Sequence, residues 1–268
     1  MNKNLYLKEL KRNRKNLIVW TLIVVGFTFM VLSIYPFMRE MGKDMSTLLD
    51  SMPVELQKAM GMDADTWNHI LGFYSTYYGV YIIVLVSIYT ASTGTGIISK
   101  EERDRTAEFL LTKPITRKEI VISKLLALFT LTMIIYITQL VAAIVGVLIF
   151  GESSFDWNTF LIMHISGLAL ILLFTCIGVL ISMYVKPKKN FMGIVVGITF
   201  GSYFINAISK STDATSWLGY FSPFHYLDFD VNAPDYSLNS WAILSFIIIG
   251  LGMLWLTNKV YNKKDIDG

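Results

Sequence analysis

The sequence of 268 residues predicts an all-α integral membrane protein with six transmembrane helices and both termini on the cytoplasmic side. Three observations lead to this fold class. Uncharged apolar stretches long enough to cross about 30 Å of hydrocarbon as a helix recur six times. Basic residues gather in alternate connecting segments. Hydrophobic residues make up 54% of the chain, and no connecting segment is large enough for a second domain, so we expect one membrane domain over residues 1–268.

The six predicted spans follow one another with short connections. None contains Asp, Glu, Lys or Arg, each of which would cost about 2.5–3.5 kcal/mol at the centre of a membrane helix. The predicted spans cover about residues 17–37, 70–99, 125–150, 157–185, 190–209 and 236–258.

The basic residues predict which way the chain is oriented. If the N-terminus is cytoplasmic, 19 of the 23 Lys and Arg residues lie on inner segments, and the outer side keeps Arg39, Lys43, Lys58 and Lys210. Retention of basic residues in the cytoplasm fixes the orientation of membrane proteins. We therefore expect a multi-pass protein of a bacterial cytoplasmic membrane. The inner charge is interpreted as a topology signal and a contact with lipid headgroups, not as a nucleic-acid site.

The N-terminal segment, residues 1–16, alternates leucines with basic residues. This pattern is typical of an amphipathic helix that lies in the headgroup layer with its basic side outward. The alternative is a disordered basic tail that serves only the topology.

The inner loop between spans two and three, from Ser99 to Lys124, contains two capping-box patterns. The first begins at Ser99 with Glu102 three residues on, and the second begins at Thr116 with Glu119 three residues on. Pro114 disfavours helical geometry at the residue before it. The loop therefore predicts a short surface helix over about residues 100–112, which either docks into another protein or is a solvated charged connector.

This loop resembles the cytoplasmic-loop signature of type 2 ABC exporter permeases. The resemblance rests on the stretch ERDRTAEFLLTKPITR, from Glu102 to Arg117, followed by Lys124. It extends to the six-span layout, the basic N-terminal segment and the turn at Ser222-Pro223-Phe224. In that family the loop is a coupling helix that sits in a groove of a separate ATPase subunit. The resemblance implies this role for Glu101, Glu102, Arg103, Arg105, Thr106 and Glu108.

The resemblance also implies the partners. ATP and Mg would be bound by the partner ATPase subunits, because this chain has no phosphate-binding loop of the G-x-x-x-x-G-K-[ST] type. We expect no cofactor, no metal and no catalytic residue on this chain itself. A second permease copy, identical or similar, would complete the transporter in the lipid bilayer. Gly193, Gly197 and Gly201 share one helix face and predict close packing, either with that copy or with another span.

Polar groups within the spans are candidates for a translocation path. Tyr81 and Tyr89 belong to a span rich in rings and hydroxyls, although its outer tyrosines also fit an aromatic belt at the membrane surface. Gln139 and His164 are isolated polar groups in other spans. An intramembrane His is a functional candidate by default, and the alternative is a hydrogen bond to a neighbouring Ser or backbone carbonyl.

One outer loop holds His225, Asp228 and Asp230, which have the chemistry of metal ligands. Nothing else in the loop completes a site, so we interpret it as an ordinary polar turn.

The leading interpretation is a permease subunit of an ATP-driven exporter that moves an amphipathic peptide, toxin or antibiotic out of the cell by alternating access. In this respect the chain resembles exporters of peptide toxins such as phenol-soluble modulins. One alternative is an intramembrane enzyme of the prenyl-protease type, to which the pair Glu101-Glu102 has a superficial likeness. No histidine lies in register with that pair, and there is no H-E-x-x-H motif. Another alternative is a non-transporting membrane anchor or immunity protein that recruits the ATPase.

Overall fold

The computed structural model describes residues 1–40, 51–53, 55–56, 69–103, 115–151, 155–184, 191–227, 229–231 and 236–263. All regular secondary structure in these ranges is helical, and six helical segments are long and apolar enough to cross a membrane. The predicted all-α class with six spans is therefore confirmed.

The spans are formed by six helical segments with the following bounds. The first is α1 (Lys3–Glu40), and the second is built from α4 (Ile70–Tyr77), η2 (Tyr78–Ile82) and α5 (Ile83–Arg103). The others are α7 (Arg117–Phe150), α8 (Trp157–Tyr184), α9 (Phe191–Ser211) and α10 (Ser240–Lys263), with the short helices η3 (Asp213–Phe221) and η4 (Pro223–His225) between the last two.

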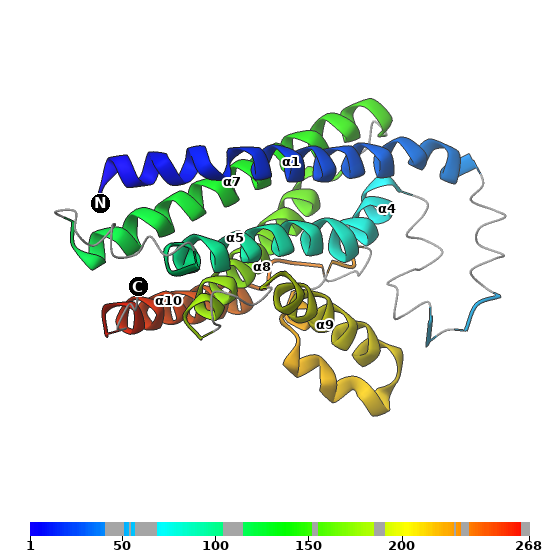
Figure 1. Ribbon diagram of the computed structural model, residues 1–268. Coiled ribbons are helices and arrows are strands. Elements are labelled where there is room, and N and C mark those ends of the chain that lie inside the picture. Colours follow the sequence, from blue (N-terminus) through cyan, green and yellow to red (C-terminus); the bar gives the residue numbers. More distant parts are fainter. Residues whose placement is uncertain are drawn as a thin grey trace.

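Span two occupies the centre of the bundle. α5 packs along α8, α1 packs along α7, and α10 packs along the other side of α8 (Figure 1). In the most apolar window of span two 83% of the residues are buried, against 22% in α9 and in α10. The outer faces of α9 and α10 are consequently available to lipid or to another chain.

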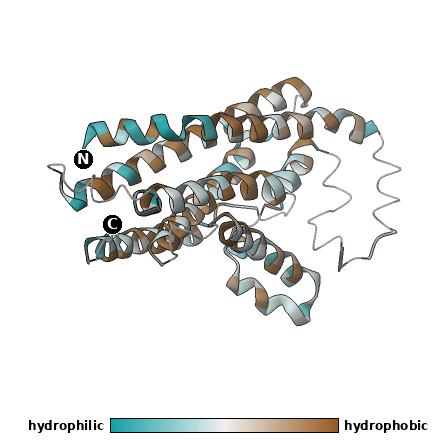
Figure 2. Ribbon diagram, viewed as in Figure 1, coloured by the Kyte–Doolittle hydropathy of each residue, from teal (hydrophilic) through white to brown (hydrophobic). Residues whose placement is uncertain are grey.

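Both termini lie at the same end of the bundle (Figure 1). We call it the basic end, because it carries Lys3, Lys8, Arg117 and Lys259; Figure 2 shows the hydrophilic start of α1 there and apolar helix surfaces beyond it. The common position of the termini agrees with the even number of spans.

Backbones of α5 and α8 approach closely at two glycines. A Cβ on Gly178 would overlap the carbonyl oxygen of Ala91, and one on Gly94 would lie 3.1 Å from the carbonyl oxygen of Thr175. Small residues let membrane helices pack by direct backbone contact, and here they hold the central helix against α8.

The structure differs from the sequence-based expectation at the N-terminus. Residues 3–16 do not form a separate helix but the first turns of α1, which continues without interruption into the span. Leu5 and Glu9 are buried, whereas Lys8 and Lys11 are exposed. The segment is amphipathic as predicted, but its apolar side packs on protein.

The two predicted capping boxes have different outcomes. Thr116 caps α7 as predicted: its Oγ1 accepts the Glu119 N–H at 3.2 Å, and a Glu119 carboxylate oxygen accepts the Thr116 N–H at 3.1 Å. The box expected at Ser99 is wrong, because α5 runs through to Arg103 and Ser99 Oγ donates back to the Thr95 carbonyl at 2.7 Å. A serine within a continuing helix bonds the preceding turn instead of capping a new one.

Span two also contains a feature that the sequence pattern did not predict. The turn from Tyr78 to Ile82 is π-helical, and α-helix resumes at Ile83. Such single turns insert an extra residue into a helix and are frequent at functional sites. Tyr81, one of the predicted path residues, lies within this turn.

Candidate functional site

Five helices meet at the basic end around an apolar cluster separate from the main core. It draws on α1, α5, α7, α8 and α10, and its buried members are Leu5, Ile97, Ile98, Ile120, Val121, Ala127, Leu128, Val179, Met183 and Tyr261. The predicted coupling loop leaves from one of these helices, α5, and returns to another, α7. The cluster therefore packs the two helix ends that flank the loop against three other helices.

A buried ion pair lies beside this cluster. The Glu9 carboxylate on α1 is 3.8 Å from the Lys124 ammonium on α7, and both side chains are only 1% exposed. Lys124 Nζ also donates to the carbonyl oxygen of Ile97 on α5. Arg12 contributes a second cation, 3.7 Å from the same Glu9 oxygen. One lysine thus joins three helices, including both helices that flank the coupling loop.

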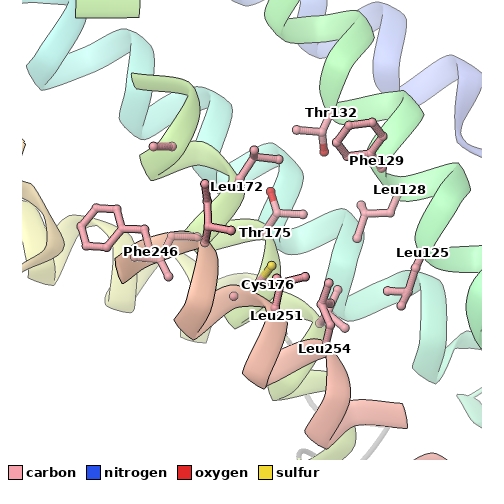
Figure 3. Close-up of a pocket in the computed structure, with 15 residues that line it drawn as sticks. Leu125, Leu128, Phe129, Thr132, Leu172, Thr175, Cys176, Phe246, Leu251 and Leu254 are labelled. Atoms are coloured by element: carbon pink, nitrogen blue, oxygen red, sulfur yellow. The ribbon is translucent and has the colours of Figure 1, made fainter. Parts of the chain in front are cut away.

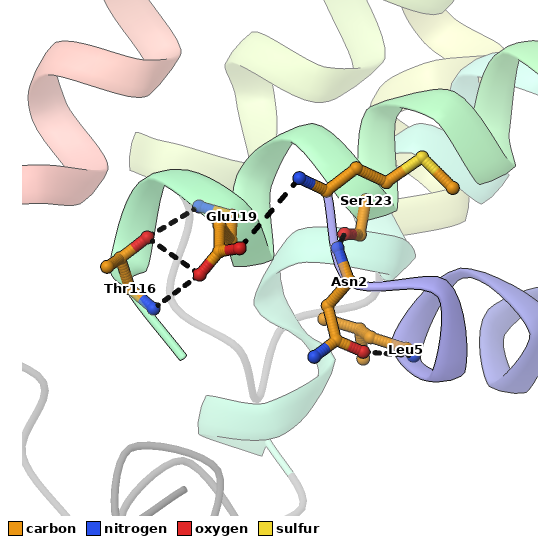
Figure 4. A network of polar contacts seen from close by, with 6 residues as sticks. Asn2, Leu5, Thr116, Glu119 and Ser123 are labelled. Atoms are coloured by element: carbon orange, nitrogen blue, oxygen red, sulfur yellow. Dashed lines mark hydrogen bonds and ion pairs between the residues drawn. The ribbon is translucent and has the colours of Figure 1, made fainter. Parts of the chain in front are cut away.

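Polar contacts also fix the N-terminus against the first turns of α7 (Figure 4). The backbone N–H of Asn2 donates to Ser123 Oγ at 2.8 Å, and the terminal ammonium lies 3.9 Å from a Glu119 carboxylate oxygen. Hydrogen bonds from the Thr116 backbone and hydroxyl lower the pKa of Glu119 below its ordinary value of 4.5. Farther along, the Tyr6 and Thr130 hydroxyls are 3.0 Å apart. The first turns of α1 therefore belong to the bundle and are not a free tail.

The end of α10 is attached to the same region. Arg117, at the start of α7, donates from Nη1 to the carbonyl oxygen of Asn262 at 3.2 Å. The start of α7 is consequently linked to α1, α5 and α10.

The predicted coupling residues fall at the border of the described chain. Glu101, Glu102 and Arg103 form the last helical turn of α5, whereas Arg105, Thr106 and Glu108 lie outside the described residues. Their role in contacting an ATPase stays a prediction. The structure shows instead which contacts hold the end of α5 and the start of α7, the two helix ends that the loop connects.

A second polar group of residues is buried among α4, α7 and α8. Gln139 Nε2 donates to the Tyr74 hydroxyl at 2.8 Å, and this hydroxyl lies 3.4 Å from His164 Nε2. His164 Nδ1 is 2.9 Å from the carbonyl oxygen of Phe160, and the Tyr136 hydroxyl donates to the His164 carbonyl at 3.0 Å. His164 thus has the backbone hydrogen bond that its alternative interpretation expected. The network joins three helices.

The predicted path residues lie in two separate places. Gln139 and His164 belong to this interior network, whereas Tyr81 and Tyr89 face α1. The Tyr81 ring is 46% exposed and lies 5.6 Å from Phe27, and the buried Tyr89 ring lies 5.9 Å from Trp20. Within the described residues, only Tyr81 of the four is open to the surroundings.

The glycine stripe of α9 has open space in front of it. A Cβ on Gly193, Gly197 or Gly201 would have no atom of the described residues within 4 Å outside its own helix turn. No described span of this chain therefore packs on the stripe.

The outer loop after η3 is a turn that is held by Ser222 hydrogen bonds and by contacts between aromatic rings. Ser222 Oγ donates to the Ser202 carbonyl at 2.6 Å and caps η4 by accepting the Phe224 N–H at 3.2 Å. The ring of His225 lies 5.4 Å from Tyr220 and 5.5 Å from Tyr226. Asp228 lies outside the described residues, so the trio with His225 is not tested.

The buried pair of Glu9 and Lys124 was missed by reasoning from the sequence, although a signal for it exists. Glu9 follows the buried Leu5 by four residues, and Lys124 follows the buried Ile120 by four. Each charge thus interrupts the apolar stripe of its own helix. Two opposite charges, each on the buried stripe of a neighbouring helix, indicate a buried pair.

Comparison with known protein families shows which family the chain belongs to. The family model of the ABC-2 family transporter protein matches residues 3–266, nearly the whole chain. The chain matches no curated protein and no solved structure. Members of this family are transmembrane permease subunits that associate with ABC ATPase subunits. On six membrane-spanning helices and a family match of this extent, the chain belongs to the ABC-2 family of transporter proteins.

Proposed function

We propose that this chain is the permease subunit of an exporter that moves an amphipathic substrate out of a bacterial cell. Separate ATPase subunits bind ATP and Mg, and their closure moves the spans between inward-open and outward-open arrangements, a rigid-body form of alternating access. The chain carries out no chemical step itself.

The observation that best supports the proposal is the contact of Lys124 with both Glu9 and Ile97. These three residues belong to α7, α1 and α5, and the coupling loop connects α5 to α7. A displacement of the loop would be transmitted to both of its flanking helices, α5 and α7, and through Glu9 also to α1. Rigid, packed elements transmit displacement in this way, whereas a solvated connector would not need a buried charge pair at its base.

The second permease copy is proposed to pack against the glycine stripe of α9. The open space in front of Gly193, Gly197 and Gly201 supports this, because small residues on a membrane helix permit close approach of another helix. The partially exposed Tyr81 lies on the side of span two that faces α1. We infer that the path runs along this side, between the two copies.

Substrate class and direction can be tested with the complete complex. The chain and its ATPase subunits are reconstituted into vesicles, and accumulation of a fluorescent amphipathic peptide is followed after adding ATP outside. We expect accumulation only in vesicles whose ATPase subunits face outward and are competent to hydrolyse ATP. Accumulation without ATPase subunits would contradict the proposal. ATP hydrolysis that never leads to accumulation of any amphipathic compound would favour the anchor or immunity role.

The coupling residues are tested in the same vesicles. Glu108→Ala is expected to reduce ATP-driven accumulation at least fivefold while the permease still assembles in the membrane. The matched control is Asp213→Ala, an exposed acidic residue at the opposite end of the bundle. Equal transport by both variants would remove Glu108 from the ATPase contact.

A further inference from the structure

An apolar groove of about 250 Å³ lies between α7, α8 and α10 (Figure 3). Figure 3 shows Leu125 and Phe129 of α7 on one side and Leu251 and Leu254 of α10 on the other, with Cys176 of α8 beside Leu251. The groove exists because α10 packs along α8 but makes little contact with α7, which packs mainly along α1. The proposed transport function does not use it.

The groove has the depth of about one membrane leaflet. Its lining runs from Leu125 to Thr132 on α7 and from Phe246 to Leu254 on α10. At 1.5 Å per residue these stretches are roughly 10–12 Å long. Half of a hydrocarbon core is about 15 Å. Relative to the predicted spans 125–150 and 236–258, both stretches lie in the half nearer the basic end, with Phe246 at about the midpoint of its span. The groove therefore lies in the cytoplasmic leaflet of the predicted topology.

Two lysines, Lys118 and Lys259, lie at the end of the groove that is nearer the termini. Lys118 precedes Leu125 by seven residues, which is two helical turns on the same side of α7. Lys259 follows Leu251 by eight, and its ammonium lies 5.0 Å from the ring centroid of the exposed Trp255. Trp and Lys are typical of the membrane–water boundary.

The same end is closed by the hydrogen bond from Arg117 to Asn262. This bond holds the start of α7 near the end of α10, so Lys118 and Lys259 belong to helix ends that converge beneath the groove. The charged side chains that continue these two stripes towards the rim, Lys118 and Lys259, are both basic, so they give the rim positive charge.

We propose that the groove binds one acyl chain of an anionic phospholipid from the cytoplasmic leaflet, with the headgroup at Lys118 and Lys259. An apolar slot of single-leaflet depth fits an acyl chain, and basic residues at a membrane surface attract anionic headgroups. A second protein helix would not require a positive rim at the headgroup level. The bound lipid fills the space between α7 and α10 and holds these helices at a fixed separation.

The test uses phospholipids that carry a photoactivatable diazirine in one acyl chain. The full chain is reconstituted with its ATPase subunits into phosphatidylcholine vesicles that contain a small fraction of either photoactivatable phosphatidylglycerol or photoactivatable phosphatidylcholine. Labelled peptides are mapped by mass spectrometry. We expect labelling of the peptides around Leu125, Cys176 and Leu251 to be at least fivefold higher with phosphatidylglycerol.

Two kinds of variant separate the apolar and charged parts of the site. Gly250→Phe fills the groove, since even a Cβ there lies 3.3 Å from Cys176 Sγ, and it should reduce the labelling at least tenfold. Gly252→Phe is the control on the same helix, with open space at its Cβ. The double variant Lys118→Gln/Lys259→Gln should lose the preference for phosphatidylglycerol, because each lysine near the surface contributes about fivefold to binding of anionic lipid.

Equal labelling of the wild-type groove by the two lipids would overturn the proposal, and this comparison needs no variant to fold. Undiminished labelling in a folded Gly250→Phe protein would overturn it as well. Protection of the groove from both photoactivatable lipids in the assembled complex would overturn it too, and would favour a contact between protein chains at this place.

Discussion

Replacing Lys124 by Met should destabilise the protein more than any exposed substitution on the same helix. The change leaves the Glu9 carboxylate, which is 1% exposed, with Arg12 as its remaining close cation in the described structure. Loss of one partner of a buried pair costs about 3–5 kcal/mol, and Arg12 at 3.7 Å favours the lower end. At about 2–4 °C per kcal/mol, the apparent melting temperature should fall by roughly 6–12 °C.

The measurement is thermal unfolding of the full chain in detergent, with Lys118→Met as control, because Lys118 is exposed on the same helix. The control should change stability by about 0.5 kcal/mol or less. The double variant Glu9→Gln/Lys124→Met contains no unpaired buried carboxylate. It should be more stable than Lys124→Met alone, with a coupling energy of at least about 1.5 kcal/mol between the two sites. Additive losses, or a fall of under 2 °C for Lys124→Met, would refute the description of this pair as a link between helices.

Three further predictions concern the glycines and the cap of α7. Gly178→Ala should lower stability by about 1–3 kcal/mol, because its Cβ would overlap the Ala91 carbonyl; Gly96→Ala, with open space at its Cβ, should not, and equal melting curves would disprove the close helix contact. Gly197→Ile should abolish self-association measured by light scattering but leave the monomer folded, whereas Gly26→Ile, equally open on α1, should leave association intact. Thr116→Ala should cost about 1 kcal/mol at pH 7. Since the folded-state pKa of Glu119 is lowered, the stabilisation that its ionised carboxylate contributes to the capping box is present above pH 4.5 and is lost as the pH falls through the folded pKa. The stability difference between wild type and Thr116→Ala should therefore shrink in acid, and a difference that stays constant would be the contrary result.

The span pattern made the fold predictable, because six uncharged stretches leave few arrangements open to a chain in lipid. The cap at Thr116 was equally predictable, since it depends on residues three positions apart. The box at Ser99 failed because a capping pattern can also occur inside a helix whose following residues keep helical geometry. Local sequence does not say which of these outcomes the rest of the fold will favour.

The candidate site was only partly predictable for a different reason. Glu9 and Lys124 are 115 positions apart, and their pairing depends on α1 lying against α7, which no local pattern determines. The same holds for Gln139 and His164, which the sequence shows as isolated polar groups; their common partner, Tyr74, is one of the outer tyrosines of span two, for which both an aromatic belt and a translocation path were open. Hydrophobic periodicity identifies the buried face of a helix but not the helix that will cover it.

The π-helical turn at Tyr78–Ile82 is a point at which one half of span two could rotate about the helix axis relative to the other half. An α-helix advances about 100° per residue, and the π turn accommodates one residue more than an α turn would. If the surplus residue were absorbed, the half of the span containing Tyr74 would swivel by about that angle relative to the half containing Tyr89, without any change in the length of either half. This rotation would turn all aromatic rings on one half of the helix together. A local rearrangement in the middle of the helix would therefore change which side chains a transported molecule contacts.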